Sequence, residues 1–506
     1  MIDMSAANDG ISLLFGDFQA WIVVPIGILI GLVFGAIPGI SISVAMAIFL
    51  PATLYMDFLP AILFLTAIFT GGGFGGAIPA ILMNIPGTSS AVATAFDGYP
   101  MAQQGRHSEA LGIGLAASVI GTFLGYIALF LIVEFVAEWV LRLGPTEMFV
   151  VALWGLTLIA LLNTGSFAKG IVAGMIGILI ATIGYSDAGQ MRGTFGSMYL
   201  LDGIPAIPAL IGLFAASELF NLIGRDYLVR DESLRTVSMA KIVGGMKDAM
   251  RRPLELFRSS AIGVGIGLVP GVGASIANLA AYGVAKRAAK DPASYGAGNP
   301  GGVIASEGAN SSSEGASMVS LLALGIPGGA GTAVLLGAFA MHNVTGGPRF
   351  ISENKDIVYA LIFGNMVQAV LLLFIGVVFV RFAGVIVKVP LRILAPLVMV
   401  MSVLGAYALT GNMVGPVTVV VAGILGWFMR RYGFPVAATV VGLLVGGMAE
   451  GELVRSYQVS GGDLSFVAGR PITLLLIALL VLSLMPRLIV NLRQRGKPAA
   501  STGDAS

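Results

Sequence analysis

Residues 299–347 read NPGGVIASEGANSSSEGASMVSLLALGIPGGAGTAVLLGAFAMHNVTGG, a polar, glycine-rich tract inside a strongly apolar chain. Backbone that Gly and Pro interrupt has N–H and C=O groups that hydrocarbon cannot satisfy, so in a membrane it persists only where protein or water covers it. The tract contains Asn310 and three consecutive serines and ends in an Ile-Pro-Gly-Gly break at residues 326–329. It therefore predicts interrupted backbone that lines a cavity for a polar ligand.

The composition of the whole chain indicates a membrane protein. Of its 506 residues 57% are hydrophobic and only 11% are charged, and the mean hydropathy is +0.94, well outside the range of soluble domains. Apolar runs near the roughly 20 residues that span a bilayer recur from residues 22–50 to residues 472–484. We expect an all-α polytopic membrane protein.

Residue types that many enzymes need are missing. The absence of cysteine excludes disulfides, iron–sulfur clusters and thiol nucleophiles. The two histidines, His107 and His342, do not have the spacing of zinc ligands. Neither a Walker A motif nor a Gly-x-Ser-x-Gly elbow is present. We therefore expect no enzyme activity, no metal site, no cofactor and no nucleic-acid partner.

The distribution of basic residues predicts the orientation. No Lys or Arg precedes Arg106, whereas residues 225–258 contain eight and the C-terminal tail contains several more. The positive-inside rule then places the N-terminus in the periplasm, and the central segment and the C-terminus in the cytoplasm. Residues 97–100, Asp-Gly-Tyr-Pro, are typical of a turn before Arg106, which would anchor a membrane end.

Two Pro-Gly breaks occur twice in the same order. Residues 37–39, Ile-Pro-Gly, return as Val-Pro-Gly at residues 269–271, and residues 85–87, Ile-Pro-Gly, return at residues 326–328. Gly/Pro-interrupted segments at corresponding positions of inverted halves indicate a secondary transporter whose site lies between the halves. The simpler alternative is that each pair only kinks an ordinary helix.

We expect four parts: an N-terminal transmembrane repeat at residues 1–224, a charged cytoplasmic linker at 225–257, a C-terminal inverted repeat at 258–450, and a final helix with a basic tail at 451–506. The first repeat begins beside acidic residues and the second beside basic ones, which predicts opposite orientations. Lys286, Arg287 and Lys290 would lie in the periplasm if the segment before them crossed outright. A re-entrant hairpin that turns at Pro270 would return them to the cytoplasmic side.

The later break of each half supplies the candidate substrate ligands. Helices that begin after residues 86–87 and 327–328 would direct N–H groups and positive dipole ends into one cavity, which suits an anion, and Gly would allow close approach. The expected substrate-binding residues are Asn84, Pro86, Gly87, Thr88, Ser89, Asn310, Ser311, Ser312, Pro327, Gly328, Gly329 and Thr332. Alternatively, small residues only allow close helix packing, an interpretation that we favour for Gly112, Gly114, Gly121 and Gly125.

The candidate ion-coupling residues fall into two chemical groups. Ser41, Ser43, Ser275 and Asn278 offer the oxygen ligands that suit Na⁺, although a helical serine can instead bond to its own preceding turn. Glu307 and Glu314 are candidate proton carriers, because a carboxylate inside a membrane is a functional hypothesis by default. Glu307 could alternatively lie solvated in a loop.

Several long motifs, at residues 77–88, 96–106, 304–310 and 322–328, resemble the large membrane subunit of the tripartite tricarboxylate transporters. The resemblance covers nearly the whole chain. It implies a permease of the bacterial inner membrane that works with a small four-helix membrane subunit and a periplasmic solute-binding protein. Citrate-like tri- or dicarboxylates would be imported with Na⁺ or H⁺. One departure is Pro-Gly-Gly-Val at residues 300–303, where the family commonly has Pro-Glu-Gly-Val.

The sequence is thus interpreted as an ion-coupled carboxylate symporter subunit. A passive anion channel is the first alternative, since it would also need interrupted backbone, but no ring of like charges for selectivity is evident. An intramembrane hydrolase is the second alternative.

Overall fold

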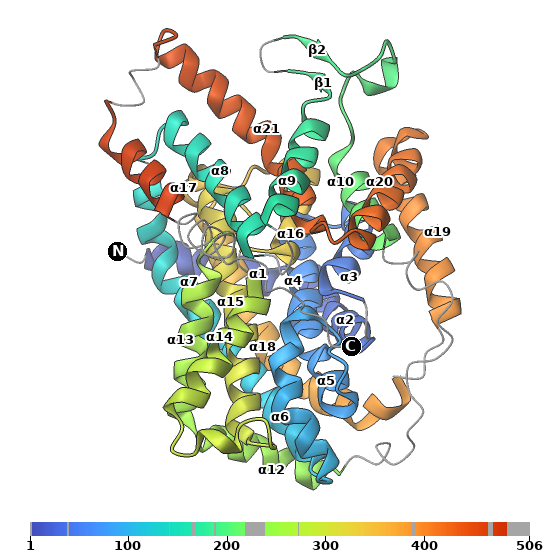
Figure 1. Cartoon of the computed structure of the whole chain (residues 1–506), viewed down its shortest axis with the longest axis vertical. Helices are drawn as coiled ribbons and strands as arrows, with labels where there is room; N and C mark the ends of the chain where they lie inside the picture. Colours follow the sequence, from blue (N-terminus) through green and yellow to red (C-terminus); the bar gives the residue numbers. More distant parts are fainter. Residues whose placement is uncertain are drawn as a thin grey trace, which may run out of the picture.

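The computed structural model describes residues 3–37, 40–140, 142–162, 167–186, 189–217, 238–271, 273–386, 391–463 and 469–482. Over these residues the fold is a helical bundle with one two-stranded β hairpin (Figure 1). Six helices are long and apolar enough to cross a membrane: Phe18–Gly35, Phe58–Met83, His107–Val140, Lys355–Phe382, Val414–Arg431 and Val436–Val459. The prediction of an all-α polytopic membrane protein is confirmed.

The first part of the chain contains α1 (Met4–Gly16), α2 (Phe18–Gly35), α3 (Ile42–Phe49), η1 (Leu50–Tyr55), α4 (Phe58–Gly75), α5 (Ala77–Met83), η2 (Ser89–Ala91), α6 (Val92–Gln103), α7 (His107–Val140), α8 (Pro145–Leu162), α9 (Phe167–Ala181), β1 (Gly184–Tyr185), β2 (Met191–Arg192), η3 (Met198–Leu200), α10 (Ala206–Ile211) and η4 (Gly212–Ala216). β1 pairs with β2 in an antiparallel register, Gly184 opposite Arg192.

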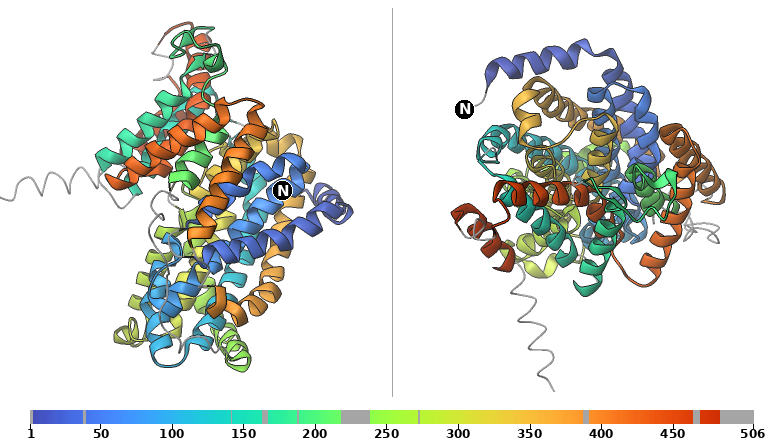
Figure 2. Two further views of the ribbon diagram at one scale, coloured as in Figure 1. Left: turned by 90° about the vertical axis from the view of Figure 1, so that its right-hand side faces the viewer. Right: turned by 90° about the horizontal axis from the view of Figure 1, so that it is seen from above.

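The second part contains α12 (Met239–Met250), α13 (Pro253–Gly267), α14 (Gly273–Ala288), η6 (Pro292–Ser294), α15 (Pro300–Leu324), α16 (Ala330–Met341), α17 (Pro348–Glu353), α18 (Lys355–Ile386), α19 (Leu391–Thr410), α20 (Val414–Arg431) and α21 (Val436–Val459). A further apolar helix, Pro471–Leu482, follows. Figure 2 shows that β1, β2 and the end of α21 lie at one end of the molecule, and α6 and α12 at the other.

The early break of each half forms a hairpin rather than a crossing. After α3 and η1 the chain returns to the start of α2, where the Asp57 N–H donates to the Gln19 side chain over 3.4 Å. In the second half α13 and α14 lie side by side (Figure 1). The open end of this hairpin, where α13 begins and α14 ends, lies beside the start of α15. A Cβ on Gly301 of α15 would lie 2.8 Å from the carboxylate of Glu255 in the first turn of α13. The predicted hairpin of α13 and α14 is present, with Lys286 and Arg287 at the end where α13 begins, and its re-entry into the membrane from the cytoplasmic side stays a prediction.

The long helices of the two halves run in opposite directions. Thr70 of α4 bonds to Glu314 of α15, and the Gly73 carbonyl, further along α4, bonds to Asn310, which is earlier in α15. Residue numbers that increase along α4 therefore pair with residue numbers that decrease along α15. α4 and α15 therefore pack antiparallel, an arrangement compatible with inverted repeats, and the inversion of the two halves stays a prediction.

Glycines bring α7 against α15. A Cβ on Gly121 would lie 2.5 Å from the Gly308 carbonyl oxygen, and one on Gly125 would lie 2.5 Å from the Ser312 carbonyl oxygen. Backbone contact at this distance is possible only without a side chain, as in small-residue packing of membrane helices. The packing interpretation of these two glycines is confirmed.

Two sequence expectations about local structure were wrong. Residues 300–324 form one continuous helix, and the interruption is confined to residues 325–329. Four serines of this helix bond back to a carbonyl three residues earlier, and α6, α7, α13 and α14 pack around it, so its polar groups are satisfied without unwinding. Residues 97–100 lie inside α6 instead of in a turn, where hydrogen bonds from the Tyr282 hydroxyl and the Gly298 N–H hold the Asp97 side chain.

Candidate functional site

Segments from all four breaks meet at one cavity of about 130 Å³. Its walls come from the chain after the first break, from the start of α6, from the start of α14 and from the start of α16, with contributions from α4 and α15. The lining residues are Ser41, Ile42, Ser43, Phe69, Thr88, Ser89, Ser90, Gly273, Ala274, Ser275, Ser313, Ser317, Gly328, Gly329, Ala330 and Gly331.

Four helix beginnings therefore face this cavity. Ser41 caps α3 and accepts the Val44 N–H over 3.4 Å. Gly273 begins α14 with φ of +68°, a conformation that favours glycine. η2 begins at Ser89 and leads into α6 at Val92, and α16 begins after Gly329. Since the first turn of a helix has N–H groups without intrahelical partners and a partial positive charge, four such turns make the cavity favourable for an anion.

Hydroxyl groups supply the remaining polarity. Ser41 and Ser43 hydroxyls are 2.9 Å apart, and those of Thr88 and Ser90 are 3.1 Å apart. A third pair, Ser89 and Ser275, joins the two halves across 2.8 Å. None of the lining residues is charged, so recognition here would depend on hydroxyl and backbone groups.

Seven of the predicted ligands line this cavity: Ser41, Ser43, Thr88, Ser89, Ser275, Gly328 and Gly329. The sequence analysis assigned these residues to two separate sites, one for the ion and one for the substrate. In the structure the serines expected to bind the ion lie beside the residues expected to bind the substrate. The cavity thus brings the two predicted sites together.

The other predicted ligands lie outside its lining. Asn84 is exposed and ends α5 in the left-handed region, with φ of 56°. Asn310 is buried and donates to the Gly73 carbonyl over 3.3 Å. Ser312 donates to the Ser260 carbonyl over 3.0 Å, which ties α15 to α13.

Three further predicted ligands, Thr332, Asn278 and Gly87, form hydrogen bonds with other parts of the protein. Thr332 accepts the Gly329 N–H over 2.9 Å at the start of α16, and Asn278 accepts the Ala93 N–H over 3.0 Å. Gly87 packs beside Gly76, to whose carbonyl its N–H donates over 3.1 Å. Pro86, Ser311 and Pro327 are not among the lining residues either.

Glu307 and Glu314 are buried within the bundle, with 0% and 4% of their surface exposed. Thr94 and Ser118 hydroxyls donate to Glu307, the latter over 2.9 Å. Thr70 and Tyr126 hydroxyls donate to Oε1 of Glu314 over 2.6 and 3.0 Å. The alternative of a solvated Glu307 is wrong, because α6, α7 and α15 enclose it. Among the residues that the structure describes, neither carboxyl group takes part in a salt bridge.

Three lining residues were not singled out as ligands although the sequence offered some signal. Ser313 and Ser317 are four residues apart, a spacing that puts both on one face of a helix, and Ser90 directly follows Ser89. Phe69 had no distinguishing signal, because an aromatic residue in an apolar run is usually part of the core.

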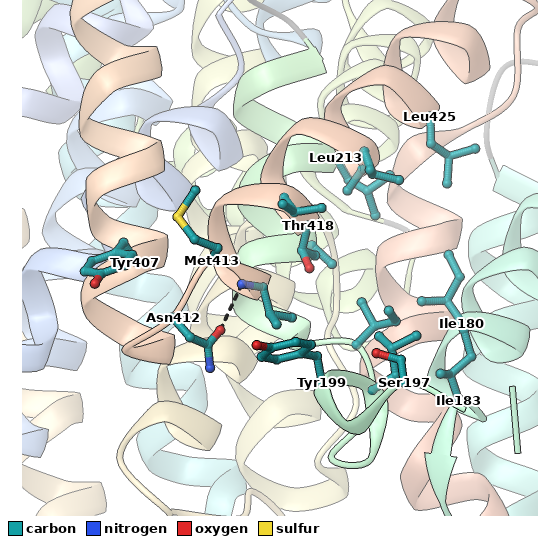
Figure 3. Close-up of a pocket in the computed structure, with 17 residues that line it drawn as sticks. Ile180, Ile183, Ser197, Tyr199, Leu213, Tyr407, Asn412, Met413, Thr418 and Leu425 are labelled. Carbon is teal, nitrogen blue, oxygen red and sulfur yellow. Dashed lines mark hydrogen bonds between the residues drawn. The ribbon is translucent and has the colours of Figure 1, made fainter. Parts of the chain in front are cut away.

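A larger cavity of about 770 Å³ lies away from the breaks, between α9, α10 and α20 (Figure 3). Apolar side chains such as Ile180 and Leu213 form most of its wall, with Tyr199, Tyr407 and Asn412 at one side (Figure 3). A carboxylate there would lose its hydration without an equivalent set of donors. The smaller cavity is therefore the candidate site.

Comparison with known proteins identifies the family of this chain and two relatives. Residues 21–494 match the family model of the tripartite tricarboxylate transporter TctA family. An uncharacterised 52.8 kDa protein in the TAR-I ttuC' 3' region of Agrobacterium vitis is 30% identical over 469 residues, which cover 91% of this chain and 92% of the relative. An uncharacterised protein in the TAR-II ttuC' 3' region of the same organism is 29% identical over 230 residues, 46% of this chain and 95% of the relative. No solved structure matches the chain.

Proposed function

This chain belongs to the tripartite tricarboxylate transporter TctA family, and we propose that it is the large permease subunit of a binding-protein-dependent secondary transporter. The transporter would import citrate-like tri- or dicarboxylates by symport with Na⁺ or H⁺. Its partners would be a small four-helix membrane subunit and a periplasmic solute-binding protein. The chain would lie in the bacterial inner membrane, with its N-terminus in the periplasm and its C-terminus in the cytoplasm.

The observation that carries this proposal is the convergence of four helix beginnings on one hydroxyl-lined cavity. N–H groups and hydroxyls would bind carboxylate oxygens and replace part of their hydration. Because the lining has no fixed cation, binding would remain reversible, as a carrier requires. Thr88, Ser89, Ser275, Gly328 and Gly329 would contact the substrate.

The coupling ion would use one of two sets of groups. Ser41, Ser43 and the neighbouring backbone carbonyls would provide oxygen ligands for Na⁺. Alternatively, Glu307 and Glu314 would accept protons, since a buried carboxylate without a cationic partner is much more stable in its neutral form.

The test is uptake of labelled citrate and smaller dicarboxylates into proteoliposomes that contain this chain, its small partner and the binding protein, with Na⁺ and H⁺ gradients imposed separately. We expect accumulation that requires one gradient and falls at least about tenfold in Ser89→Ala and Ser275→Ala, since each loses a hydrogen bond to a charged group worth about 1.5–3 kcal/mol. Ser352→Ala is the matched control, because Ser352 is exposed and bonds only within its own helix.

Two outcomes would overturn the proposal. Equilibration without accumulation under either gradient would indicate a passive channel. Hydrolysis of lipid or peptide by the purified chain, without any uptake, would indicate an enzyme.

A further inference from the structure

Asp97 is a fully buried carboxylate that belongs to neither the cavity lining nor the pair of buried glutamates. Its Oδ1 accepts the N–H groups of Gly296, Gly298 and Asn299 over 2.8, 2.9 and 2.8 Å. Its Oδ2 accepts the Tyr282 hydroxyl over 2.9 Å. Asp97 lies on α6 in the first half, whereas all four donors belong to the second half, on α14 or in the segment before α15. The carboxylate is therefore a bridge between the halves.

The bridge lies on a longer contact between α6 and α14. At the cavity, Ser89 and Ser275 hydroxyls are 2.8 Å apart. One turn further, the Ala93 N–H donates to the Asn278 side chain over 3.0 Å. The partners advance together in number, so α6 and α14 leave the cavity side by side and in parallel. We name this row of contacts, from Ser89 and Ser275 to Asp97 and Tyr282, the α6–α14 seam.

Asp97 accepts the strongest hydrogen bonds of the seam. A charged acceptor makes hydrogen bonds about twice as strong as a neutral one, whereas the other polar contacts of the seam join neutral groups. The carboxylate also occupies space that only a glycine leaves free, since a Cβ on Gly302 would lie 2.0 Å from its Oδ2. The phenol of Tyr282 in turn packs edge-on against Phe96 at 5.3 Å between ring centroids.

The seam connects Asp97 to the candidate cavity through rigid helices. Asp97 lies on α6, which continues from η2 with Ser89 at its start eight residues earlier, and Tyr282 follows Ser275 by seven residues within α14, about 10 Å at 1.5 Å per residue. A slide of α6 along α14 would shift η2, which is directly joined to α6, and would therefore increase the separation of the Ser89 and Ser275 hydroxyls at the cavity.

We infer that Asp97 is a positioning residue that fixes α6 against α14 and thereby sets the distance between Ser89 and Ser275 across the candidate cavity. Its effect on transport rests on the proposed function, but its effect on the seam does not. Asp97 would not touch the substrate.

The test uses the absence of cysteine from the chain. In the full-length protein, Ser89→Cys with Ser275→Cys should form a disulfide readily under mild oxidation in membranes. We expect Asp97→Ala to slow this cross-link at least about tenfold, because the N–H groups of Gly296, Gly298 and Asn299 lose a charged acceptor, and Asp97→Asn to have a smaller effect. Asp291→Asn, which removes an exposed carboxylate from the same loop, should change nothing.

A second cysteine pair separates positioning from general damage. Thr146→Cys with Ser456→Cys joins α8 to α21, where the hydroxyls are 2.6 Å apart, away from the seam. Asp97→Ala should leave the rate of this cross-link unchanged. In transport assays without cysteines, Asp97→Asn should raise KM several-fold with little change in the maximal rate.

The inference is overturned if Asp97→Ala leaves the Ser89–Ser275 cross-link as fast as in the parent protein, or if it slows both cysteine pairs equally. Should Asp97→Ala prevent folding, Tyr282→Phe decides, because it removes one bond from Oδ2 and must slow the seam cross-link alone. If the parent protein moves no carboxylate, the proposed function fails while the cross-linking rates still decide the role of Asp97.

Discussion

Replacing Glu314 by Ala should destabilise the protein, whereas replacing it by Gln should not. Thr70 and Tyr126 both donate to the same carboxyl oxygen, Oε1. The Gln carbonyl can accept both hydroxyls, and its amide group imitates a protonated carboxyl. Ala leaves two buried hydroxyls without an acceptor, at about 1–3 kcal/mol each. We therefore expect Glu314→Ala to lose about 2–6 kcal/mol of stability and Glu314→Gln to remain close to the parent.

The first assay is thermal unfolding of the purified protein in detergent. At about 2 °C per kcal/mol, the lower end for a large domain, Glu314→Ala should lower the melting temperature by at least about 4 °C. Glu353→Gln is the control, because Glu353 is exposed. The second assay is proton-driven uptake, which Glu314→Gln should abolish if Glu314 carries the proton, while exchange of substrate across the membrane without a gradient continues.

Two results would refute this reasoning separately. Destabilisation of Glu314→Gln as large as that of Glu314→Ala would show that the hydroxyls do not hold a neutral acceptor. Undiminished proton-driven accumulation by Glu314→Gln would remove Glu314 from the coupling mechanism.

Two further predictions concern the cavity. A disulfide between Ser89→Cys and Ser275→Cys should leave the uptake of the double variant nearly unchanged, because Asp97 already fixes α6 against α14; a loss of uptake on cross-linking that a reducing agent reverses would show that the two helices move apart during transport. Gly328→Ala should lose about 1–3 kcal/mol, because its Cβ would lie 2.6 Å from the Ser317 Cβ, whereas Gly329→Ala should fold normally since its nearest neighbour would be 3.4 Å away; equal melting temperatures for the two variants would contradict the contact.

The hairpins were predictable because their signals are local. Apolar runs, Pro-Gly pairs and the basic residues near Lys286 each act on a few neighbouring residues, and together they indicate that α13 and α14 fold back. The helix at residues 300–324 was not predictable in the same way. Its glycines and serines oppose a helix in isolation, and packing against the surrounding α7, α13 and α14 makes the helical form favourable.

The candidate site was predicted in outline, and the choice among its residues was not. Asn84 and Ser89 lie beside the same break, offer polar groups and are both exposed, yet Ser89 lines the cavity and Asn84 does not. The difference is the direction in which the chain turns at the break, which depends on the contact of Gly87 with Gly76. Asp97 had no signal at all, since its four donors lie roughly 200 residues away in the chain.

The sequence by itself determined that this is a membrane protein of helices, where its backbone is interrupted, and that the interruptions recur in two halves, because hydrophobicity and the backbone limits of Pro and Gly are properties of short segments. Only the tertiary structure decided that four helix beginnings share one cavity, that Ser89 meets Ser275, and that Asp97 joins the halves. These contacts connect residues far apart in the chain, and which of them form depends on how two complete halves pack.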